Sequence, residues 1–452
     1  MDKAIFTDLF ALLDEKKYWE LHAALTKMNP VDIAGILDSL EGERLLFVFR
    51  LLPKDIAAET FVEMDSQSQE SLIRAFSDSE LKAIVNELFA DDTVDIIEEM
   101  PANVVKRIIR NADATLRRSI NEILQYPNDS AGSIMTTEFV DLKAEMTVEE
   151  AFEHIRATGL DKETVYTCYI TDNNRHLTGV VSVRTLLLAA PRTPLADIME
   201  TNIIFVNTTD DREDVAKKFD KYDFLALPVV DREQRLVGIV TFDDAIDVLQ
   251  EEANEDFAKM AAMTPIETSY LETSVFAHAR KRIVWLLILM LSATFTGILI
   301  TKYENAFEAL PLLVSFIPML MDTGGNCGAQ SSTMIIRGLA TDEISFDDYF
   351  RVLFKEARIS VCISVTLAAV NTLRVLIMYG FTHEMLMISL VLGITLIFSV
   401  LLAKALGCSL PMLAKKCKLD PAIMASPLIT TIVDACSVLI YFNVATLILH
   451  LK

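Results

Sequence analysis

A single aspartate stands in the middle of a long apolar stretch near the end of the chain. Between residues 421 and 451, Asp434 is the only Asp, Glu, Lys or Arg, and a transmembrane helix needs only about 20 apolar residues. A carboxylate at mid-membrane depth costs at least about 2.5 kcal/mol on insertion scales. It therefore indicates either an ion or proton pathway or a structural pair with a basic residue. The intramembrane candidates for such a pair, Arg374 and Lys404, lie near segment ends, so we expect both to reach the membrane surface.

The neighbours of Asp434 favour a cation pathway. Ser426, Thr430 and Thr431 precede it by eight, four and three residues. On a helix these spacings place the hydroxyl groups on the same face as the carboxylate. The sequence thus predicts an oxygen-lined stripe in which these four side chains contact a metal ion.

A second polar run, "PMLMDTGGNCGAQSSTMIIRGLA" (318–340), interrupts another apolar segment. We expect its proline to free a main-chain carbonyl. Small residues alone would allow close helix packing in lipid, whereas a run this polar inside a span also suits the wall of a water-filled cavity. The predicted pore-lining residues are Pro318, Gly325, Asn326, Gly328 and Gln330.

The two oxygen-rich segments suit a hard, hydrated cation. Mg²⁺ gives up water reluctantly and is commonly held by one or two carboxylates, whereas Ca²⁺ usually takes more direct ligands. The six histidines are scattered, which argues against a histidine metal site, and no two of the six cysteines form a CxxC pair. No lysine follows the glycines as in a P-loop, and no HExxH or nucleophile elbow occurs. The chain is therefore not predicted to be an enzyme.

A third set of candidate residues is acidic and precedes the apolar half of the chain. Asp243, Asp247, Glu251 and Glu255 recur every four residues, a spacing at which like charges destabilise a helix by about 0.2–0.5 kcal/mol per pair. A solvated acidic face and a regulatory cation site are both open interpretations. The acidic candidates identified by spacing are Asp92, Asp95, Asp220, Asp223, Asp243, Asp244, Asp247, Glu251, Glu252, Glu255 and Asp256.

The composition separates an acidic half from a membrane half. The 452 residues are 52% hydrophobic with a net charge of −23, and the acidic excess lies in the first 275 residues. Such a charge repels nucleic acid and attracts cations, so we expect no nucleic-acid partner. Five apolar segments, each long enough to span lipid bilayer, follow at about 283–301, 310–336, 359–379, 385–410 and 422–450.

The loops between these segments predict an orientation in a cell membrane. Basic residues gather at 280–282, 337–358 and 415–418, all on one side of a five-span arrangement. The positive-inside rule places that side, with the acidic half, in the cytoplasm. The C-terminus is then expected outside.

The soluble half shows two kinds of repeat. "NPVDIAGIL" (29–37) echoes "LPKDIAAET" (52–60) within an amphipathic helical pattern, which indicates a helical superstructure or an irregular bundle. "HLTGVVSVRTLL" (176–187) matches "RLVGIVTFDDAI" (235–246), with Gly179 over Gly238. We expect each copy to form a strand, a helix, two short strands and a helix. A linker follows, helical to about Met263 and broken at Pro265.

This second repeat resembles a tandem pair of CBS domains, a regulatory module that often binds adenosine nucleotides. In that family a GxxT/SxxD pattern supplies an Asp to the ribose. The second copy keeps it as Gly238, Thr241 and Asp244, whereas the first has Thr185 at the Asp position. The resemblance implies ATP at the pair, held through Thr241 and Asp244.

The whole chain resembles the MgtE family of magnesium transporters and channels. The most specific matches are "GGNCGAQSSTMIIRGLA" (324–340) and "DPAIMASPLITTIVDACSVLIYF" (420–442). The resemblance implies a homodimer with a pore between subunits, lined by the second and fifth segments. Asp434 matches the family's pore aspartate and Asp420 an acidic residue at the cytoplasmic mouth, while Ser426 stands where some relatives have Asn.

The resemblance also implies a mode of regulation by Mg²⁺. Cytosolic Mg²⁺ would bridge the N domain, the CBS pair and the connecting helix, and would close the pore when abundant. The residues expected to face each other are Glu59, Asp91 and Asp95 on one side and Asp223, Asp244 and Asp247 on the other.

The expected fold is a multi-domain chain that combines all-α and α/β parts. It has a superhelical N domain (1–130), an α/β CBS pair (131–196 and 197–250), a connecting helix (251–275) and an all-α five-helix transmembrane domain (276–452). The predicted function is Mg²⁺ import down the electrochemical gradient, shut by cytosolic Mg²⁺. The alternatives are a secondary transporter of Co²⁺ or Ni²⁺, and a membrane-anchored nucleotide or Mg²⁺ sensor without transport.

Overall fold

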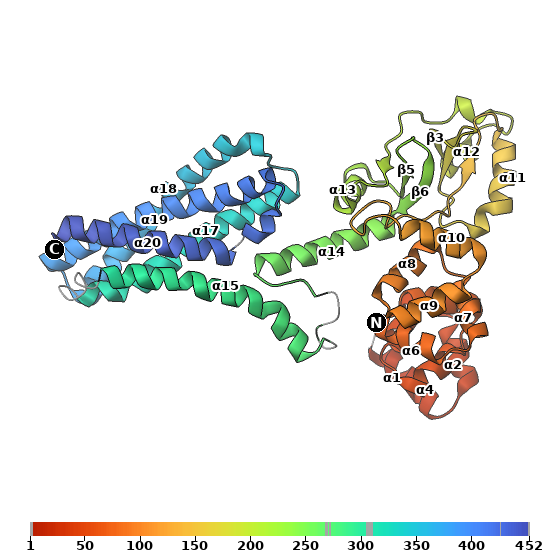
Figure 1. The fold of residues 1–452 in the computed structure, drawn as a ribbon, viewed down its shortest axis with the longest axis horizontal. Helices are drawn as coiled ribbons and strands as arrows, with labels where there is room; N and C mark the ends of the chain where they lie inside the picture. The colour runs from red at the N-terminus through yellow and green to blue at the C-terminus, as the bar shows by residue number, and fades with distance from the viewer. Residues whose placement is uncertain (1–2, 267–269, 271–272, 304–310, 425, 451–452) are drawn as a thin grey trace. The chain divides into compact units, whose positions relative to one another are not determined.

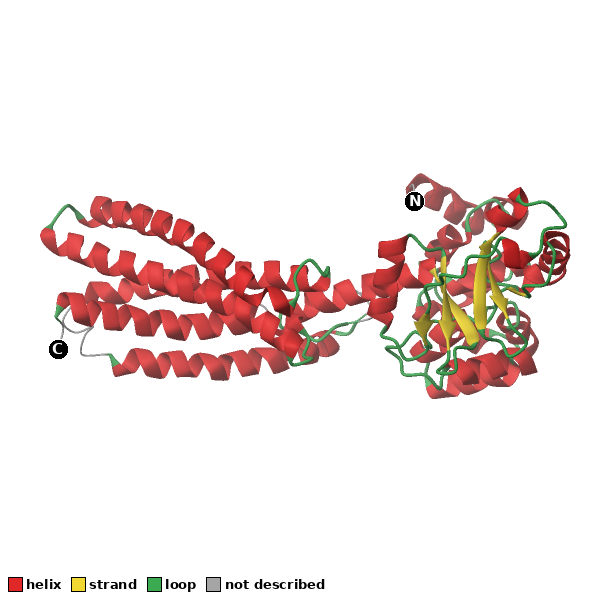
Figure 2. Cartoon of the chain, turned by 90° about the horizontal axis from the view of Figure 1, so that it is seen from above, coloured by secondary structure: helices red, strands yellow, loops and turns green. Residues whose placement is uncertain are grey.

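The computed structural model describes residues 3–266, 270, 273–303, 311–424 and 426–450 (Figure 1). The side chains of residues 3–8 and of Ser426 lie outside this description. The chain forms two compact units, Met1–Gln250 and Glu251–Lys452. The strands all belong to the first unit, and the described part of the second is helical (Figure 2).

The first unit begins with a series of short helices. Each is amphipathic, and together they bury one continuous apolar core that includes Leu25, Ile33 and Phe61. Pro30 lies in the first turn of one helix, where its missing N–H has no intrahelical partner to lose. The helices are α1 (Lys3–Asp14), α2 (Tyr18–Leu25), α3 (Pro30–Leu37), α4 (Gly42–Phe49), α5 (Lys54–Val62), α6 (Ser66–Ala75), α7 (Asp78–Val85), α8 (Ala90–Glu99), α9 (Ala102–Asn111) and α10 (Ala114–Ile123).

These helices stack in series. Helix α3 packs on α5, α5 on α7 and α7 on α9, while α4 packs on α6 and α8 on α10. The two similar segments of the sequence repeat, 29–37 and 52–60, form α3 and α5. These two helices are the first pair that packs in this series. The helical superstructure is therefore the interpretation that the structure supports, rather than an irregular bundle.

Two three-stranded sheets follow, in the orders β1-β2-β3 and β4-β5-β6. In each, the first pair is parallel and the second antiparallel, and each has an irregularity at the same place, after Ile170 and after Val229. The elements are β1 (Asp141–Leu142), α11 (Val148–Thr158), β2 (Thr167–Thr171), β3 (Leu177–Ser182), α12 (Val183–Leu188), β4 (Val206–Asn207), α13 (Arg212–Tyr222), β5 (Ala226–Val230), β6 (Leu236–Thr241) and α14 (Phe242–Met260).

The two repeated glycines explain how the copies interlock. A Cβ at Gly179 would lie 2.6 Å from Sδ of Met199, and one at Gly238 would lie 2.7 Å from Sδ of Met135. Each methionine lies at the start of the other copy, so each glycine leaves room for the first residues of its partner copy. The expected order of strands and helices in the pair is confirmed.

Helix α14 departs from the expectation at both ends. It begins at Phe242, inside the second repeat, and runs without a break to Met260. It ends three residues before the predicted limit, and Ala262 adopts a left-handed conformation with φ of 53°. The predicted break at Pro265 thus lies after the helix has already ended.

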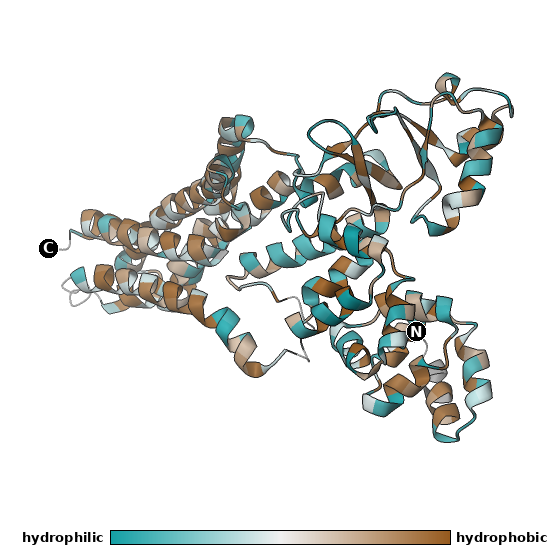
Figure 3. Cartoon of the chain, turned by 45° about the vertical axis from the view of Figure 1, so that its right-hand side comes forward, coloured by the Kyte–Doolittle hydropathy of each residue, from teal (hydrophilic) through white to brown (hydrophobic). Residues whose placement is uncertain are grey.

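Five long helices make up most of the described part of the second unit. They run alongside one another, and their exposed surfaces are largely apolar (Figure 3). They are α15 (Val275–Lys302), α17 (Ile317–Ala340), α18 (Tyr349–Tyr379), α19 (His383–Lys416) and α20 (Ser426–Leu449), with short 3-10 helices at Pro311–Phe316, Phe346–Asp348 and Pro421–Met424.

Four of these helices, α15, α18, α19 and α20, lie in stretches long and apolar enough to cross a membrane. Helix α17 does not meet that criterion, although it matches the second of the five predicted segments. The reason is the polar run that contains Asp322, Asn326 and Gln330. Helix α17 packs on α19, on α20 and on the preceding 3-10 helix.

Candidate functional site

Three glycines bring α17 into close contact with α20. A Cβ added at Gly324 would lie 2.8 Å from Oγ of Ser437, and one at Gly325 would lie 2.7 Å from Cγ2 of Thr430. A Cβ at Gly328 would lie 2.8 Å from Ile429. Gly325 and Gly328 were predicted to line a pore, but in the protomer they serve the close packing that small residues allow between membrane helices.

The exposed face of α17 carries a row of polar residues. Asp322, Asn326, Gln330 and Thr333 are exposed at spacings of four, four and three residues, whereas the glycines between them are buried. A hydrocarbon environment would leave these groups without partners, so such a face is expected to meet water or protein. We call these four residues the polar row. Of the predicted pore-lining residues, Asn326 and Gln330 belong to this row, whereas Gly325 and Gly328 are buried.

Pro318 has a different role from the one predicted. Helix α17 begins at Ile317, and Pro318 occupies its first turn. The main-chain N–H at this position would have no intrahelical acceptor in any case, so a proline fits without breaking a helix. The expectation was that Pro318 frees a main-chain carbonyl, but in the first turn it removes no hydrogen bond within α17. Its side chain is exposed on the same side as the polar row.

Asp434 lies half-buried on α20 and has an unsatisfied oxygen. Among the described residues, no group donates a hydrogen bond to its buried Oδ1, and the buried Oγ of Ser437 also lacks a partner. Thr431 donates its hydroxyl proton to the carbonyl of Pro427 at 2.9 Å. Thr430 packs against Gly325, and the predicted contact of Ser426 lies outside the described side chains. Unpaired buried oxygens are expected where water or an ion completes the site.

Among the residues that the structure describes, no ion pair links Asp434 to Arg374 or Lys404, the two basic residues considered as partners. Arg374 is exposed and donates hydrogen bonds to Asn371 at 2.8 Å and to the sulfur of Met319. Lys404, predicted to reach the membrane surface, is instead 4% exposed. The arrangement therefore supports the pathway interpretation of Asp434 over the structural pair.

Lys404 belongs to a buried polar triad that the sequence did not reveal. Its Nζ lies 3.3 Å from Oε2 of Glu356 and 3.0 Å from Oγ of Ser331, and Ser331 donates to Glu356 at 2.5 Å. The triad joins α17, α18 and α19. A buried charge needs such partners, since an unpaired one is strongly destabilising.

Asp420, the expected residue at the pore mouth, lies just before the 3-10 helix Pro421–Met424. Its Oδ1 accepts a hydrogen bond from the main-chain N–H of Ala422 at 2.7 Å. Its Oδ2 forms an ion pair with Nζ of Lys259 at 2.6 Å. Asp420 is therefore already paired with a fixed cation at the end of α14.

The first unit gathers carboxylates from separate elements. Asp91 and Asp92 begin α8, Asp243 and Asp244 begin α14, and Glu163 lies before β2. Each acts electrostatically on others of the set. We call these five residues the acidic cluster. It joins the helical N-terminal part to the repeat pair, as the predicted juxtaposition of Asp91 and Asp244 requires.

The cluster holds its protons to unusually high pH. Burial and then the charge of Asp244 raise the pKa of Asp91 well above its usual range. Burial and the same neighbour raise the pKa of Asp92 to about 7. Burial, with Asp92 next in importance, raises the pKa of Glu163 to about 8.

The pKa of Asp244 is raised as well. Burial raises its pKa to about 6, although a hydrogen bond from the Thr241 hydroxyl opposes the shift. Because the repelling neighbours are themselves carboxylates, a divalent cation would relieve the same repulsion as protonation.

Profiles of three known families match successive parts of the chain. The MgtE divalent cation transporter profile matches residues 317–444, the MgtE intracellular N domain matches 28–129, and the CBS domain matches 131–192 and 195–251. The chain is 36% identical to the magnesium transporter MgtE of Thermus thermophilus, over 100% of both chains. It is 30% identical to the magnesium transporter MgtE of Bacillus subtilis, over 98% of this chain and 97% of that one.

The chain belongs to the MgtE family. A crystal structure of the cytosolic domain of the Mg²⁺ channel MgtE in complex with ATP matches with a TM-score of 0.51 and 37% identity. That match covers 54% of this chain and 99% of the solved one. With its four long apolar helices, this MgtE protein is a multi-pass membrane protein.

Other predicted regulatory residues of this MgtE chain remain outside the acidic cluster. Glu63 and Asp247 lie at its edge, because burial and then Asp247 raise the pKa of Glu63, whereas the predicted Glu59 is exposed one turn earlier. Of the other predicted acids, Glu255 pairs with Lys259, and Asp223 lines the cavity of the CBS pair. The rest, Asp95, Asp220, Glu251, Glu252 and Asp256, are not assigned to the cluster, and all of them except Asp220 take part in other interactions.

The cluster is not a ready-made metal cage. Within the described residues, no three or more His, Cys, Asp or Glu side chains are arranged to hold a metal ion. The predicted regulatory Mg²⁺ sites therefore remain predictions. Glu63 and Glu163 were missed because only the three-dimensional fold brings them next to Asp92.

A cavity of about 530 Å³ lies within the CBS pair, between its two copies. Tyr169, Ser182 and Thr185 line it from the first copy, and Tyr222 and Asp223 from the second. The predicted nucleotide residues are not in its lining. Instead, the Thr241 hydroxyl donates to Oδ2 of Asp244 at 2.5 Å, and Asp244 belongs to the acidic cluster.

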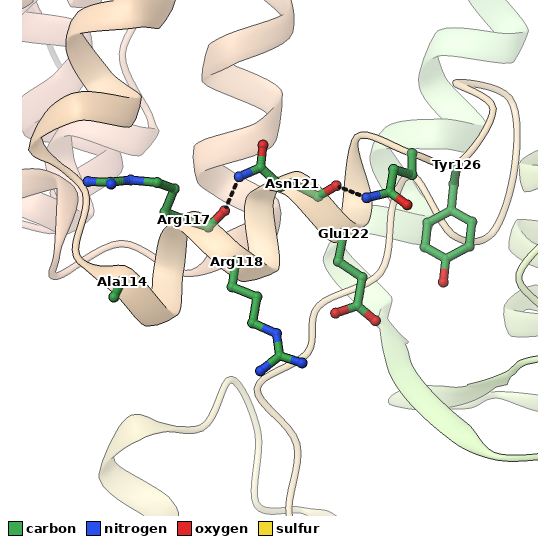
Figure 4. A pocket seen from close by; sticks show the side chains of 7 residues that line it. Ala114, Arg117, Arg118, Asn121, Glu122 and Tyr126 are labelled. Carbon is green, nitrogen blue, oxygen red and sulfur yellow. Dashed lines mark hydrogen bonds between the residues drawn. The ribbon is translucent and has the colours of Figure 1, made fainter.

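A surface cavity of about 850 Å³ lies over α10 (Figure 4). Its polar side chains are largely used by the helix itself. Arg117 donates to the carbonyl of Ile109 at 2.9 Å, and Asn121 donates to that of Arg117 at 2.7 Å. Arg118 and Glu122 point to the same side and oppose each other in charge (Figure 4). This lining offers no convergent set of groups for a cation.

Proposed function

We propose that this MgtE protein conducts Mg²⁺ through the membrane along a path bordered by the polar row of α17 and by Asp434 of α20. The observation that carries the proposal is the unsatisfied Oδ1 of Asp434 beside a helix whose exposed face is polar. A hydrated Mg²⁺ ion needs oxygen ligands from few protein groups, because it keeps most of its waters. The names of the relatives from Thermus thermophilus and Bacillus subtilis support the choice of ion.

The path is completed by a second copy of the chain. In one protomer, the polar row faces outward among helices whose other exposed residues, such as Leu291 and Val365, are apolar. A homodimer that encloses this face would remove it from lipid and would leave a water-filled path between subunits. The N-terminal half lies in the cytoplasm and the C-terminus outside, as the basic loops indicate. The membrane potential then drives Mg²⁺ inward.

Cytosolic Mg²⁺ closes the path by binding at the acidic cluster. A ligand shifts a conformational balance only by its differential affinity for the two states. Carboxylates from α8 and α14 that converge in one state bind a divalent ion together, and they bind it weakly when they separate. The repulsion within the cluster, visible in the raised pKa of Asp92, makes the converged state depend on a cation or on protons.

The cavity of the CBS pair is the proposed nucleotide site. A likeness to a cytosolic domain solved with ATP supports this choice. Tyr222 and Phe224 stack at 5.5 Å beside the cavity and supply an aromatic face for a base. Because Asp244 is not in the lining, Asp244→Asn should leave ATP affinity unchanged in calorimetry, whereas Tyr222→Ala should weaken it.

The test of conduction is Mg²⁺ uptake by proteoliposomes that contain the full chain, under an imposed membrane potential. Asp434→Asn keeps the shape of the side chain and removes its charge, so uptake should be nearly lost while the protein stays folded. Glu384→Gln, which changes an exposed carboxylate in the first turn of α19, is the matched control and should keep uptake. Wild-type uptake by Asp434→Asn would overturn the proposal, as would a lack of uptake by the unaltered protein.

A further inference from the structure

Asp322 is a carboxylate in the polar row that the sequence interpretation did not include. It is exposed on α17, and Nδ2 of Asn326, one turn later, donates a hydrogen bond to its Oδ1 at 3.1 Å. This bond fixes one oxygen of the carboxylate against its own helix. Asp322 thus lies on the exposed face of α17 that carries the polar row.

The glycine contacts set the level of Asp322 relative to Asp434. Gly324, two residues after Asp322, approaches Ser437 and Val433 within 2.8 and 3.0 Å of an added Cβ. Those two residues flank Asp434 on α20. Asp322 therefore lies at about the same depth as Asp434 on the neighbouring helix, and the two carboxylates interact electrostatically.

An unsatisfied polar group marks the same place. Ser437 is 1% exposed and lies one turn from Asp434, and within the described chain its Oγ has no hydrogen-bond partner. Oδ1 of Asp434 is in the same condition. Two buried oxygens without partners, next to a pair of like charges, are the features expected where a bound cation and its waters supply the missing contacts.

We propose that Asp322 is a second ion-contacting carboxylate of the conduction path, and that with Asp434 it sets the preference for a hydrated divalent cation over monovalent ones. This inference rests on the proposed function. Mg²⁺ is commonly held by one or two carboxylates through its waters. Two negative charges at one depth match the charge of a divalent ion, whereas one monovalent ion would leave the pair uncompensated.

A purely structural role for Asp322 makes a different prediction. In that case its function would be to accept the hydrogen bond from Asn326, and Asp322→Asn would keep an acceptor oxygen at the same position. The neutral variant should then behave as the unaltered protein does. If the charge of Asp322 contacts the ion, Asp322→Asn should change ion selectivity, and Asp322→Glu should restore it.

The experiment measures uptake in proteoliposomes over a range of Mg²⁺ concentrations, with Na⁺ as the competing monovalent ion. Hexaamminecobalt(III), which has the size of hydrated Mg²⁺ and does not exchange its ligands, is added as a blocker. For Asp322→Asn we expect about a tenfold rise in the half-saturating Mg²⁺ concentration, of the order that one charge contributes near a protein surface. Block by hexaamminecobalt(III) should weaken by a similar factor. Asp322→Glu should stay within about twofold of the unaltered protein, and Glu384→Gln is the control.

The outcomes separate this inference from the proposed function. If the unaltered protein carries no Mg²⁺, the proposed function fails. If Asp434→Asn abolishes uptake but Asp322→Asn shows unchanged half-saturation and block, conduction stands and the role of Asp322 is overturned. Should Asp322→Asn fail to fold, Asp322→Ser takes its place as the neutral variant, and unchanged half-saturation and block would likewise overturn the role of Asp322. The double variant Asp322→Asn with Asp434→Glu tests whether the two residues are coupled. Two groups that contact one ion give non-additive effects on block by hexaamminecobalt(III).

Discussion

The Nζ atom of Lys259 lies 2.6 Å from Oδ2 of Asp420 and 2.6 Å from Oε1 of Glu255. One ammonium group therefore connects the last turn of α14 with the residue before the 3-10 helix Pro421–Met424. Burial alone would lower the pKa of Lys259, but its hydrogen bonds with Asp420 and Glu255 raise it above the ordinary value. The lysine stays charged throughout the physiological range and occupies a position between two carboxylates that a divalent ion could take.

Replacing Lys259 should make the protease resistance of the chain at the end of α14 depend on Mg²⁺. In Lys259→Gln, Asp420 and Glu255 lose their common cation, so Mg²⁺ becomes the group that can hold them together. Without Mg²⁺, limited proteolysis after α14 should be faster than in the unaltered protein. With Mg²⁺ the difference should disappear. The effect is expected to be modest, since partly exposed pairs contribute about 0–1 kcal/mol.

Lys281→Gln serves as the control, because Lys281 bonds the carbonyl of Pro265 rather than a carboxylate. Equal proteolysis rates for Lys259→Gln and the unaltered protein in the absence of Mg²⁺ would show that the ion pair does not hold α14. Lys259→Arg should keep the pair and resemble the unaltered protein.

The acidic cluster predicts that Mg²⁺ sensing depends on pH. In the folded chain Asp92 has a pKa of about 7 and Glu163 of about 8, whereas unfolded Asp and Glu ionise near pH 4. Between those values the folded state binds more protons, so its free energy of unfolding falls as the pH rises from about 4 through about 8 when Mg²⁺ is absent. Protons and Mg²⁺ compete for the same oxygens.

The concentration of Mg²⁺ that protects the full chain from protease should therefore fall as the pH rises from 6 to 8, by about threefold or more per unit where a proton is released. Asp92→Asn with Glu163→Gln should flatten this dependence. Glu153→Gln, an exposed carboxylate on α11, should leave it unchanged. A Mg²⁺ requirement that is the same at pH 6 and pH 8 would mean that the cluster does not bind the regulatory ion.

Lys404 and Glu356 should behave as a pair that is costly to break singly. Lys404→Met leaves Glu356 buried with only Ser331 as a partner, and loss of one member of a buried pair typically costs about 3–5 kcal/mol. The thermal unfolding midpoint of the detergent-solubilised protein should fall clearly. The double variant Lys404→Met with Glu356→Leu removes both charges and should recover most of the loss.

Lys355→Met is the control for this pair, because it removes a charge from an exposed position next to Glu356. A double variant that is as unstable as Lys404→Met would contradict the pairing. It would indicate that Lys404 stabilises the helices through Ser331 alone.

The sequence predicted the elements better than the contacts between them. The order of helices and strands, and the position of Asp434 within an apolar helix, follow from periodicity and composition. The role of Lys404 could not be predicted, because its partners Ser331 and Glu356 lie 73 and 48 residues away. A buried lysine and one that reaches the surface have the same local sequence.

The acidic residues show the same division. The residues predicted from the four-residue spacing, Asp243, Asp247, Glu251 and Glu255, all lie on α14. The cluster brings together Asp91 and Asp244, a pair that the family resemblance implied. The spacing gave no information on Glu163, which reaches the cluster through the path of the chain before β2. Asp322 is a separate case, since it stands within the polar run 318–340 and its acidic type alone is a signal for an ion-contacting residue.

A close approach between α19 and α17 gives the last prediction. A Cβ at Gly407 of α19 would lie 2.4 Å from the carbonyl oxygen of Gly328 on α17. A backbone carbonyl cannot move aside as a flexible side chain can, so Gly407→Ala should push the two helices apart. Overpacking of this kind typically costs about 1–3 kcal/mol.

Gly297→Ala is the matched control, because a Cβ at this position of α15 meets nothing within 4 Å. In a helix interior Ala is favoured over Gly by about 1 kcal/mol, so this variant should be neutral or stabilising. Gly407→Ala should instead lower the thermal unfolding midpoint and alter Mg²⁺ uptake, since α17 carries the polar row. A midpoint and an uptake rate equal to those of Gly297→Ala would show that α17 and α19 have room to separate, and that the position of the polar row does not depend on their contact.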